Sequence, residues 1–161
     1  PVMVATAGAK LLEDAALEAL RMRLLPMATV VTPNIPEAEL LLGHAIPDDE
    51  AAEAALVELL ALDARAVLLK GGHLPGNGDM VDRFDDGEAL IEFVNPRLEV
   101  EGHGTGCTLA SAIAANLCRG MPLREACSAA TNYVHGALKH GYAPGKGPVR
   151  VLAHFWQRGQ E

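Results

Sequence analysis

The sequence is poor in aromatic residues and positive charge, and it contains no long apolar run. Aromatic side chains make up only 4% of the 161 residues, so alanine and leucine must build most of a core of helices packed closely on a sheet. The formal net charge of −8 argues against binding nucleic acid through a basic face. Charged side chains interrupt residues 11–25, which argues against a signal peptide, and no stretch approaches the roughly 20 apolar residues of a membrane span. We therefore expect a chain that binds neither nucleic acid nor membrane.

Cysteine is also scarce, with three residues at positions 107, 118 and 127. Their spacing is not that of a metal site, and an odd number argues against a simple disulfide framework. Cys118 and Cys127 fall on apolar helical faces, so we predict that both are small core residues. Unpaired cysteines of this kind fit the reducing cytoplasm, which we predict as the compartment.

Strand-like and helix-like segments alternate along the chain. We expect strands at residues 2–5, 28–32 and 66–69, a hairpin of 80–84 with 89–94, and helices at 11–25, at 36–42, after Asp48 or Asp49, after residue 104 and after Pro122. Such alternation predicts an α/β fold with a parallel sheet, formed by residues 1–161 as a single domain. Ligands of such sheets bind at the carboxyl ends of the strands.

The most informative segment is the glycine-rich run at residues 102–108, which leads into an alanine-rich apolar stretch. A glycine turn at the start of a helix points several backbone N–H groups and the positive end of the helix dipole at an anion. We expect Thr105 or Thr108 to cap this helix and Cys107 to lie in its first turn, where the same field favours thiolate over thiol. The segment predicts phosphoryl or acyl transfer, or alternatively a plain glycine turn before a core helix with a buried cysteine.

Two further segments place polar side chains at predicted strand ends. Asn34 and Glu37 are three residues apart, so their amide and carboxylate oxygens could hold Mg²⁺ through its waters, or could simply cap a helix. Lys70 precedes Gly71-Gly72 and is either a ligand of a triphosphate or a solvated lysine at a strand end. Because the carboxyl ends of parallel strands meet at one edge, we expect these residues to converge with the glycine turn.

Taken in order, these segments resemble the hydroxymethylpyrimidine/phosphomethylpyrimidine kinases of thiamine biosynthesis. The motifs that carry the resemblance lie at residues 1–8, 32–39, 68–73, 103–108 and 133–136. They cover almost the whole chain, and they imply the ribokinase-like fold, a three-layer α/β/α sandwich with a mostly parallel sheet. The resemblance also implies ATP and Mg²⁺ as cofactors. The implied reaction transfers the γ-phosphate of ATP to the hydroxymethyl group of a small pyrimidine and then phosphorylates the resulting monophosphate.

The resemblance assigns roles to four residues of the first half of the chain. Asn34 and Glu37 match the Asn-x-x-Glu motif that organises Mg²⁺ and the phosphates of the family. Lys70 matches a lysine that contacts phosphate, and Val2 matches a strand-end position near the pyrimidine.

The glycine turn matches the catalytic centre of the family. Gly104, Thr105 and Gly106 match its anion hole. Cys107 matches the position where sugar kinases of the superfamily carry an aspartate base, which implies that Cys107 accepts the hydroxymethyl proton.

The chain departs from the family pattern in two places. Glu101 and Gly102 stand where the family commonly has Asn-Thr, and the family carries an aspartate and further strands before the position of Pro1. We therefore expect a carboxyl-terminal portion of the kinase fold that lacks the N-terminal portion, is a poor catalyst by itself and forms a homo-oligomer such as a dimer to cover its exposed strand. Two alternatives stay open: a pyridoxal or pyridoxine kinase of the same fold, and a catalytically inactive nucleotide-binding fragment.

Overall fold

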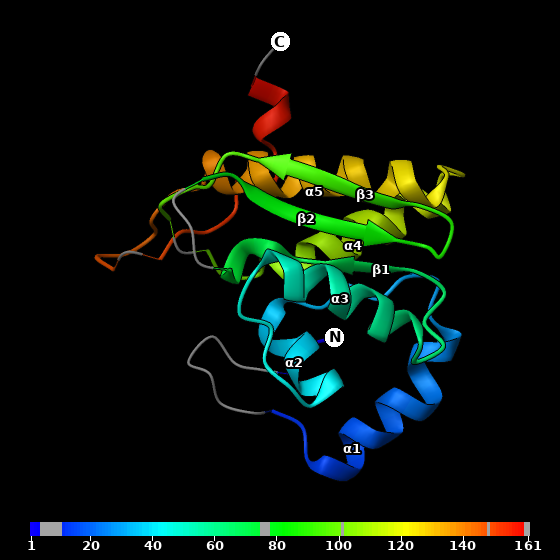
Figure 1. Ribbon diagram of the computed structural model, residues 1–161. Coiled ribbons are helices and arrows are strands. Elements are labelled where there is room, and N and C mark those ends of the chain that lie inside the picture. Colours follow the sequence, from blue (N-terminus) through cyan, green and yellow to red (C-terminus); the bar gives the residue numbers. More distant parts are fainter. Residues whose placement is uncertain (4–10, 75–77, 101, 148, 160–161) are drawn as a thin grey trace. The chain divides into compact units, whose positions relative to one another are not determined.

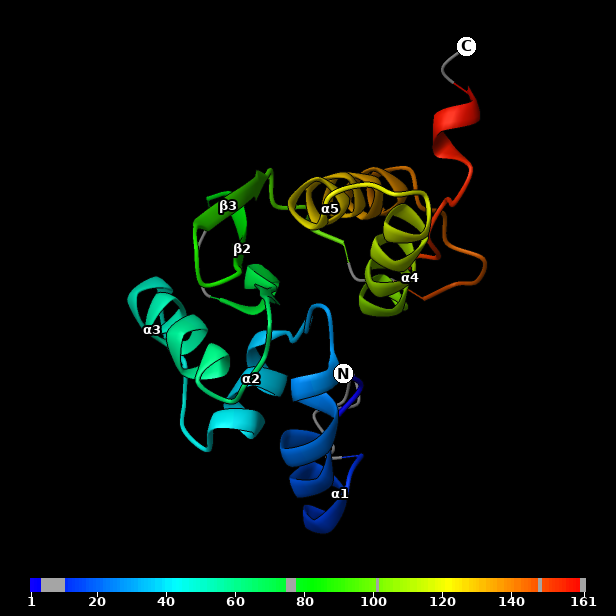
Figure 2. The same ribbon diagram turned by 90° about the vertical axis from the view of Figure 1, so that its right-hand side faces the viewer.

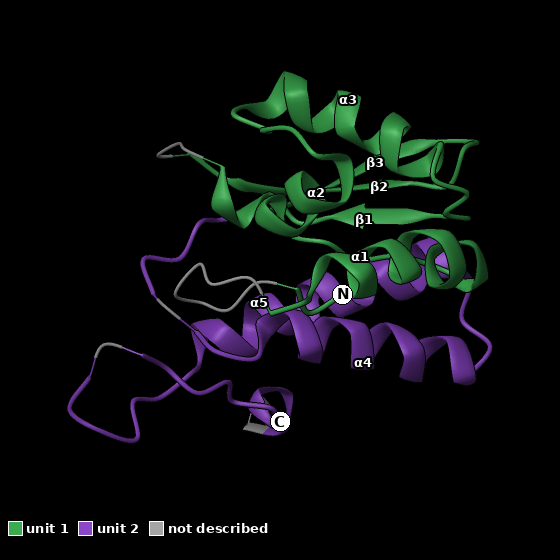
Figure 3. Ribbon diagram, turned by 90° about the horizontal axis from the view of Figure 1, so that it is seen from below, with its two compact units in different colours: residues 1–94 green, residues 95–161 purple. Residues whose placement is uncertain are grey.

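The structure is a computed structural model that describes residues 1–3, 11–74, 78–100, 102–147 and 149–159. The chain forms two compact units, residues 1–94 and 95–161 (Figure 3). Each unit is described by itself below. Within the described ranges, no helix is both long and apolar enough to cross a membrane.

Unit 1 combines short helices with a three-stranded sheet (Figure 1). Its elements are α1 (Asp14–Ala19), η1 (Leu20–Leu24), η2 (Leu25–Met27), α2 (Ile35–Leu42), α3 (Asp49–Leu60), β1 (Val67–Leu69), η3 (Gly71–His73), β2 (Met80–Asp85) and β3 (Leu90–Asn95). The strands lie in the order β1-β2-β3, and β1 pairs antiparallel with β2 so that Leu69 lies opposite Arg83. The predicted hairpin around Asp85-Asp86-Gly87 is confirmed.

A parallel pairing links β1 to the segment before α2. Val31 donates its N–H to Ala66 O at 2.9 Å, and Leu68 donates its N–H to Val31 O at 2.8 Å. Parallel bridges join Val31 to Val67 and Asn34 to Lys70. The strand predicted at 28–32 is therefore present as a short parallel contact, which brings the residues after both segments to one end of unit 1.

The helices α2 and α3 form where the sequence predicts them. Asn34 caps α2, and Gly43 ends it with φ +83°, a left-handed conformation that suits glycine. Asp48 caps α3 by accepting the N–H of Ala51 at 2.9 Å. One face of α3 is apolar and buried, and it consists of Ala52, Ala55, Leu56 and Leu59.

The start of the chain differs from the prediction. Residues 11–25 do not form one α-helix, because α1 ends at Ala19 and continues as a π turn and then a 3₁₀ turn at Pro26. Proline cannot donate the next helical hydrogen bond, and a π turn shifts the helix phase, so Leu24 leaves the face of Leu17 and is exposed. Residues 1–3 are not a strand, and the rest of the strand predicted at 2–5 lies outside the described residues.

Unit 2 is built on two helices that pack side by side, α4 (Thr105–Cys118) and α5 (Leu123–Lys139), followed by the short turn η4 (Trp156–Gly159) (Figure 2). Leu109 and Ile113 of α4 are buried, as are Ala126 and Ala130 of α5. The three cysteines are free. Cys127 is buried as predicted, but Cys118 is exposed, because the last residue of α4 lies beyond the buried part of its face.

The carboxyl-terminal segment packs onto α5. Ala153 donates its N–H to Ala137 O at 2.9 Å, and the Trp156 ring stacks on His140 with 5.3 Å between the ring centroids. A Cβ atom at Gly136 would overlap the Trp156 ring, so α5 carries a glycine where the indole lies against it.

Candidate functional site

In unit 1, Asn34 and Glu37 bind each other's backbone at the start of α2. Asn34 Oδ1 accepts the Glu37 N–H at 2.9 Å, and Glu37 Oε2 accepts the Asn34 N–H at 2.9 Å, which is a complete capping box. Glu37 Oε1 accepts the Met3 N–H at 3.4 Å, and the Glu37 residue is only 5% exposed. The helix-capping alternative named above is therefore present as a structural role of this pair.

The same pair can hold a divalent cation through its waters. Each of its three side-chain oxygens accepts one backbone N–H, which leaves further lone pairs, and Asn34 is partly exposed. Among the described residues, no group of three or more His, Cys, Asp or Glu side chains gathers as a metal-ligand set. A carboxylate and an amide oxygen suit the waters of Mg²⁺, whose remaining ligands are commonly phosphate oxygens.

Lys70 lies beside Asn34 at the end of β1. The two residues form a parallel bridge, and Lys70 donates its N–H to Pro33 O at 2.9 Å. Lys70 itself is half-buried and lies at the same end of unit 1 as the capping box. The structure thus brings together three of the residues predicted to handle metal and phosphate.

Two titratable groups near Lys70 were not predicted from the sequence. Burial raises the pKa of Asp82 to about 6, against the opposing effects of a hydrogen bond from Gly71 and of the charges on Lys70 and Arg83. Burial and then the charge of Lys70 lower the pKa of His73. The only sequence feature that could have indicated Asp82 is its position as an acidic residue among the apolar residues of β2.

Val2, the predicted pyrimidine contact, is 65% exposed. It lies next to Met3, whose N–H reaches Glu37, so Val2 borders the metal and phosphate residues of unit 1. Its contact with a pyrimidine stays a prediction.

In unit 2, the glycine turn starts α4 as predicted, but the capping residue differs. Gly104 is the N-cap with φ +81°, and among the described residues no side chain caps this helix, so neither Thr105 nor Thr108 does. Side-chain caps need an extended N-cap residue, whereas the left-handed conformation here suits only glycine well. The N–H groups of the first turn, from Thr105 to Cys107, therefore have no side-chain cap and point out of the helix start.

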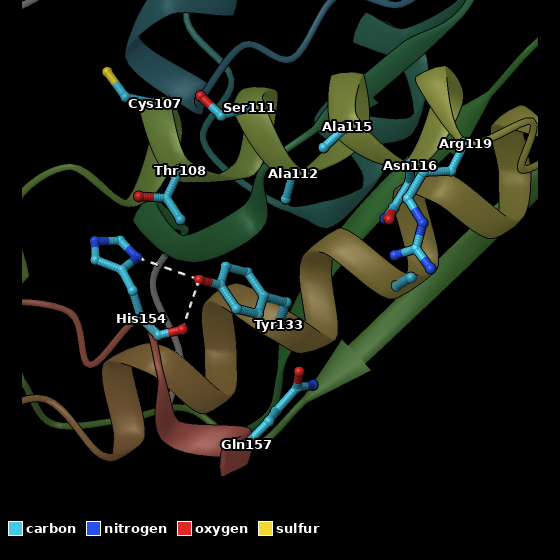
Figure 4. Close-up of a pocket in the computed structure, with 11 residues that line it drawn as sticks. Cys107, Thr108, Ser111, Ala112, Ala115, Asn116, Arg119, Tyr133, His154 and Gln157 are labelled. Carbon is cyan, nitrogen blue, oxygen red and sulfur yellow. Dashed lines mark hydrogen bonds between the residues drawn. The ribbon is translucent and has the colours of Figure 1, made fainter.

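Cys107 is exposed in the first turn of α4, which rules out the alternative of a buried cysteine. It lies at one end of a groove of about 620 Å³ between α4, α5 and the carboxyl-terminal segment. Figure 4 shows Cys107 and Ser111 on one side of α4, with Thr108 directed toward His154. Tyr133 crosses the groove floor and donates its O–H to His154 O at 3.0 Å.

The departure at Gly102 has a packing reason. A Cβ atom there would overlap Leu138 Cδ1 of α5, and Gly102 forms a parallel bridge with Arg150. The threonine common in the family would require Leu138 to move. Glu101 lies outside the described residues.

The candidate site therefore consists of two groups of residues. Asn34, Glu37 and Lys70 meet in unit 1, and the Gly104–Gly106 turn presents Cys107 in unit 2. Convergence of the two groups on one ligand stays a prediction.

A sequence model of the family described as "Phosphomethylpyrimidine kinase" matches residues 1–151. The chain belongs to this family. A hydroxymethylpyrimidine/phosphomethylpyrimidine kinase of Rhizobium meliloti is 47% identical over 163 residues, which cover 98% of this chain and 61% of that relative. The thiamine biosynthesis bifunctional protein ThiED of Geobacter sulfurreducens is 51% identical over 148 residues, covering 91% of this chain and 30% of its own length.

Solved structures confirm the ribokinase-like α/β fold of this phosphomethylpyrimidine kinase family member. The pyridoxal kinase of Staphylococcus aureus in complex with AMP-PCP superposes with a TM-score of 0.88 and 31% identity, covering 100% of this chain and 58% of that one. The chain thus spans about 60% or less of the length of these relatives.

Proposed function

We propose that the chain contributes to the ATP-dependent phosphorylation of 4-amino-5-hydroxymethyl-2-methylpyrimidine and of its monophosphate in thiamine biosynthesis. The observation that carries the proposal is the family match over residues 1–151 together with an exposed Cys107 in a helix start capped by Gly104. A basic thiol can take the proton of an acceptor hydroxyl, and N–H groups without a side-chain cap can stabilise the charge of the transferring phosphoryl group.

In this reaction, the acceptor hydroxymethyl oxygen forms a bond to the γ-phosphorus as the bond from that phosphorus to the β-phosphate oxygen breaks. The Cys107 thiolate takes the hydroxyl proton. The N–H groups of Gly104, Thr105 and Gly106 donate to the oxygens of the transferring phosphoryl group, and Lys70 contributes a point charge. Phosphoryl transfer depends mainly on such positioning and charge stabilisation.

Mg²⁺ supplies charge neutralisation of the nucleotide phosphates when it is bound. Asn34 and Glu37 would hold it through its waters, since their side-chain oxygens already accept backbone N–H groups. Because α2 starts at this pair, the capping box keeps both oxygens in fixed positions for those waters.

The proposal is tested by measuring ADP release from ATP in the presence of hydroxymethylpyrimidine, with the chain in excess over ATP so that slow transfer by a poor catalyst is still measured. We expect Cys107→Ala to lower turnover by at least about 100-fold while ATP affinity changes less than about threefold, because general-base catalysis acts in the transition state. Cys118→Ala, the same change at the exposed last residue of α4 and outside the groove, is the matched control and should keep turnover. Equal turnover of wild type and Cys107→Ala would refute the role of Cys107.

A second candidate is pyridoxal kinase activity, which the structural similarity to the Staphylococcus aureus enzyme favours. The same ADP-release measurement with pyridoxal in parallel separates the two. A ratio of kcat/KM above one for pyridoxal over hydroxymethylpyrimidine would select this alternative.

A catalytically inactive nucleotide-binding protein is the third candidate, which the N–H groups without a side-chain cap at the start of α4 favour. It predicts Mg-ATP binding by calorimetry with no phosphorylation of either acceptor.

We further propose a cytoplasmic location, in keeping with three free cysteines, and a homodimer as the working state.

A further inference from the structure

The turn after β1 is held from two sides through two consecutive backbone N–H groups. The N–H of Lys70 donates to Pro33 O at 2.9 Å, on the side of the parallel segment. The N–H of Gly71 donates to Asp82 Oδ1 at 3.0 Å, on the side of β2. A side chain at Gly71 would overlap Val81 O, so the turn lies directly against the β2 backbone. The backbone at Lys70 is therefore fixed between two neighbours, and one of them is a carboxylate.

Asp82 is an unusual residue for its position. It is 4% exposed and sits in a strand whose neighbours Arg83 and Phe84 are also buried. Burying an ionised carboxylate is costly unless it is paired and hydrogen-bonded, and an apolar side chain would fill this place without that cost. The carboxylate must therefore do something for the folded chain that an apolar residue cannot do.

The pairing of β1 with β2 indicates the role of the Asp82 carboxylate. The recorded pairing ends with Leu69 opposite Arg83, and the next residues along the two strands are Lys70 and Asp82. The carboxylate of Asp82 thus interacts with the charge of Lys70 as well as with the N–H of Gly71.

We propose that Asp82 is a positioning residue, which holds the Lys70–Gly71 turn through the Gly71 N–H and so fixes Lys70 for a nucleotide phosphate. This inference rests on the proposed kinase function only in naming phosphate as the ligand of Lys70. The turn η3 that follows packs against both β2 and α2, so loss of the Asp82 contact frees the turn on the β2 side alone.

The test is a double-mutant cycle on ADP binding by the 161-residue chain, measured by isothermal titration calorimetry at pH 7.5. Asp82→Ala should weaken ADP binding about tenfold in the wild-type background and less than about twofold in the Lys70→Met background, because the two residues act as one unit. Asp82→Asn keeps an acceptor oxygen for the Gly71 N–H and should stay within about threefold of wild type.

Phe84→Leu is the matched control for a general loss of stability. Phe84 lies two residues further along β2, is fully buried and pairs with Leu68, away from the turn. We expect it to lower the denaturation midpoint without weakening ADP binding. Each of three results would overturn the proposal. Asp82→Ala could weaken ADP binding equally in both backgrounds, or Asp82→Asn could bind ADP as weakly as Asp82→Ala does. The third such result is weaker ADP binding by the Phe84→Leu chain than by wild type.

A second measurement needs no nucleotide and separates the inference from the proposed function. Amide hydrogen exchange at Gly71, measured by NMR, should accelerate at least about tenfold in Asp82→Ala relative to a distant buried amide and stay near wild type in Asp82→Asn. If the wild-type chain binds no ADP, the proposed function fails, and the Gly71 amide still decides the inference. Equal exchange at Gly71 in all three chains would overturn it.

Discussion

At the scale of single residues, two cysteines at opposite ends of one helix offer a direct comparison. Cys107 lies in the first turn of α4 and Cys118 is its last residue, and both are exposed. The helix field stabilises negative charge at the N-terminal end and disfavours it at the C-terminal end. We therefore expect iodoacetamide, which reacts with thiolate, to label Cys107 several times faster than Cys118.

Cys127 serves as the internal control in this experiment. It is fully buried, and burial raises the pKa of its thiol to about 12, so it should stay unlabelled in the folded chain. Peptide mass mapping after limited alkylation measures the three rates together. Faster labelling of Cys118 than of Cys107 would show that the helix start does not favour an anion.

The buried Asp82 predicts a specific dependence of stability on pH. Its pKa is raised from 3.8 to about 6, so the folded chain binds the proton more tightly than the unfolded chain does. The resulting stabilisation is fully present below pH 4 and is lost as the pH rises through 6. Its upper limit is about 3 kcal/mol, because each pKa unit corresponds to about 1.4 kcal/mol.

Asp82→Asn removes this titration while the other carboxylates titrate in both chains. The free energy of unfolding of the variant minus that of wild type should therefore rise between pH 4 and pH 7. Urea unfolding followed by circular dichroism at four pH values measures this difference. A difference that stays constant over this range would mean that folding does not raise the pKa of Asp82.

The candidate site residues that could be identified from the sequence are polar or reactive residues that lie next to a recognisable turn. Asn34, Lys70 and Cys107 each follow a strand-like segment or open a helix, so their positions follow from local pattern. Asp82 was missed because its role depends on the register between β1 and β2, which no local pattern contains. The burial of Cys118 was predicted wrongly because an apolar face in sequence does not tell where the packing partner of a helix ends.

At the scale of secondary-structure elements, the contact between α5 and the carboxyl-terminal segment depends on one glycine. A Cβ atom at Gly136 would overlap the ring of Trp156, the only tryptophan of the chain. We expect Gly136→Ala to displace the indole from α5 and its stack on His140, at a cost of about 1–3 kcal/mol of stability.

The readout for Gly136→Ala is the tryptophan emission maximum, which should shift to longer wavelength as the indole becomes solvated. Gly145→Ala is the matched control, because a Cβ atom at Gly145 would meet nothing within 4 Å. An unchanged emission maximum in Gly136→Ala would mean that the segment containing Trp156 does not pack on α5.

Elements with clear boundary residues were predicted well. The helix α2 has an Asn cap and a terminal glycine, so both of its ends were predicted to within one residue. The start of α3 was predicted equally well from its aspartate cap. The segment 11–25 was predicted as one α-helix because its leucines repeat at helical spacing. Pro26 and the π turn, which depend on packing rather than on spacing, break that helix.

At the scale of the whole molecule, the sequence predicted the fold class through ordered motifs rather than through any single element. The ribokinase-like fold is confirmed by solved relatives. Among the described residues of unit 1, β1 and β2 pair antiparallel, and the parallel pairing consists of short bridges.

The molecule also exposes apolar side chains on the sheet of unit 1. Among the described strands, β3 lies at the edge, and Leu90 and Val94 on its outer face are 47% and 54% exposed. An apolar edge strand is a template for pairing with another chain. We therefore expect the chain to self-associate as a dimer through β3.

Size-exclusion chromatography with light scattering at several concentrations measures this association. Leu90→Lys places a charge on the edge strand and should shift the chain toward the monomer by at least about tenfold in dissociation constant, since lysine on an edge opposes pairing. Val57→Lys, on an exposed side of α3, is the control for added charge and should leave the association unchanged. A wild-type chain that is monomeric at about 100 μM, where weak specific dimers with micromolar dissociation constants would be populated, would contradict the prediction. Dimerisation that survives Leu90→Lys would place the contact on another surface and refute the role of β3.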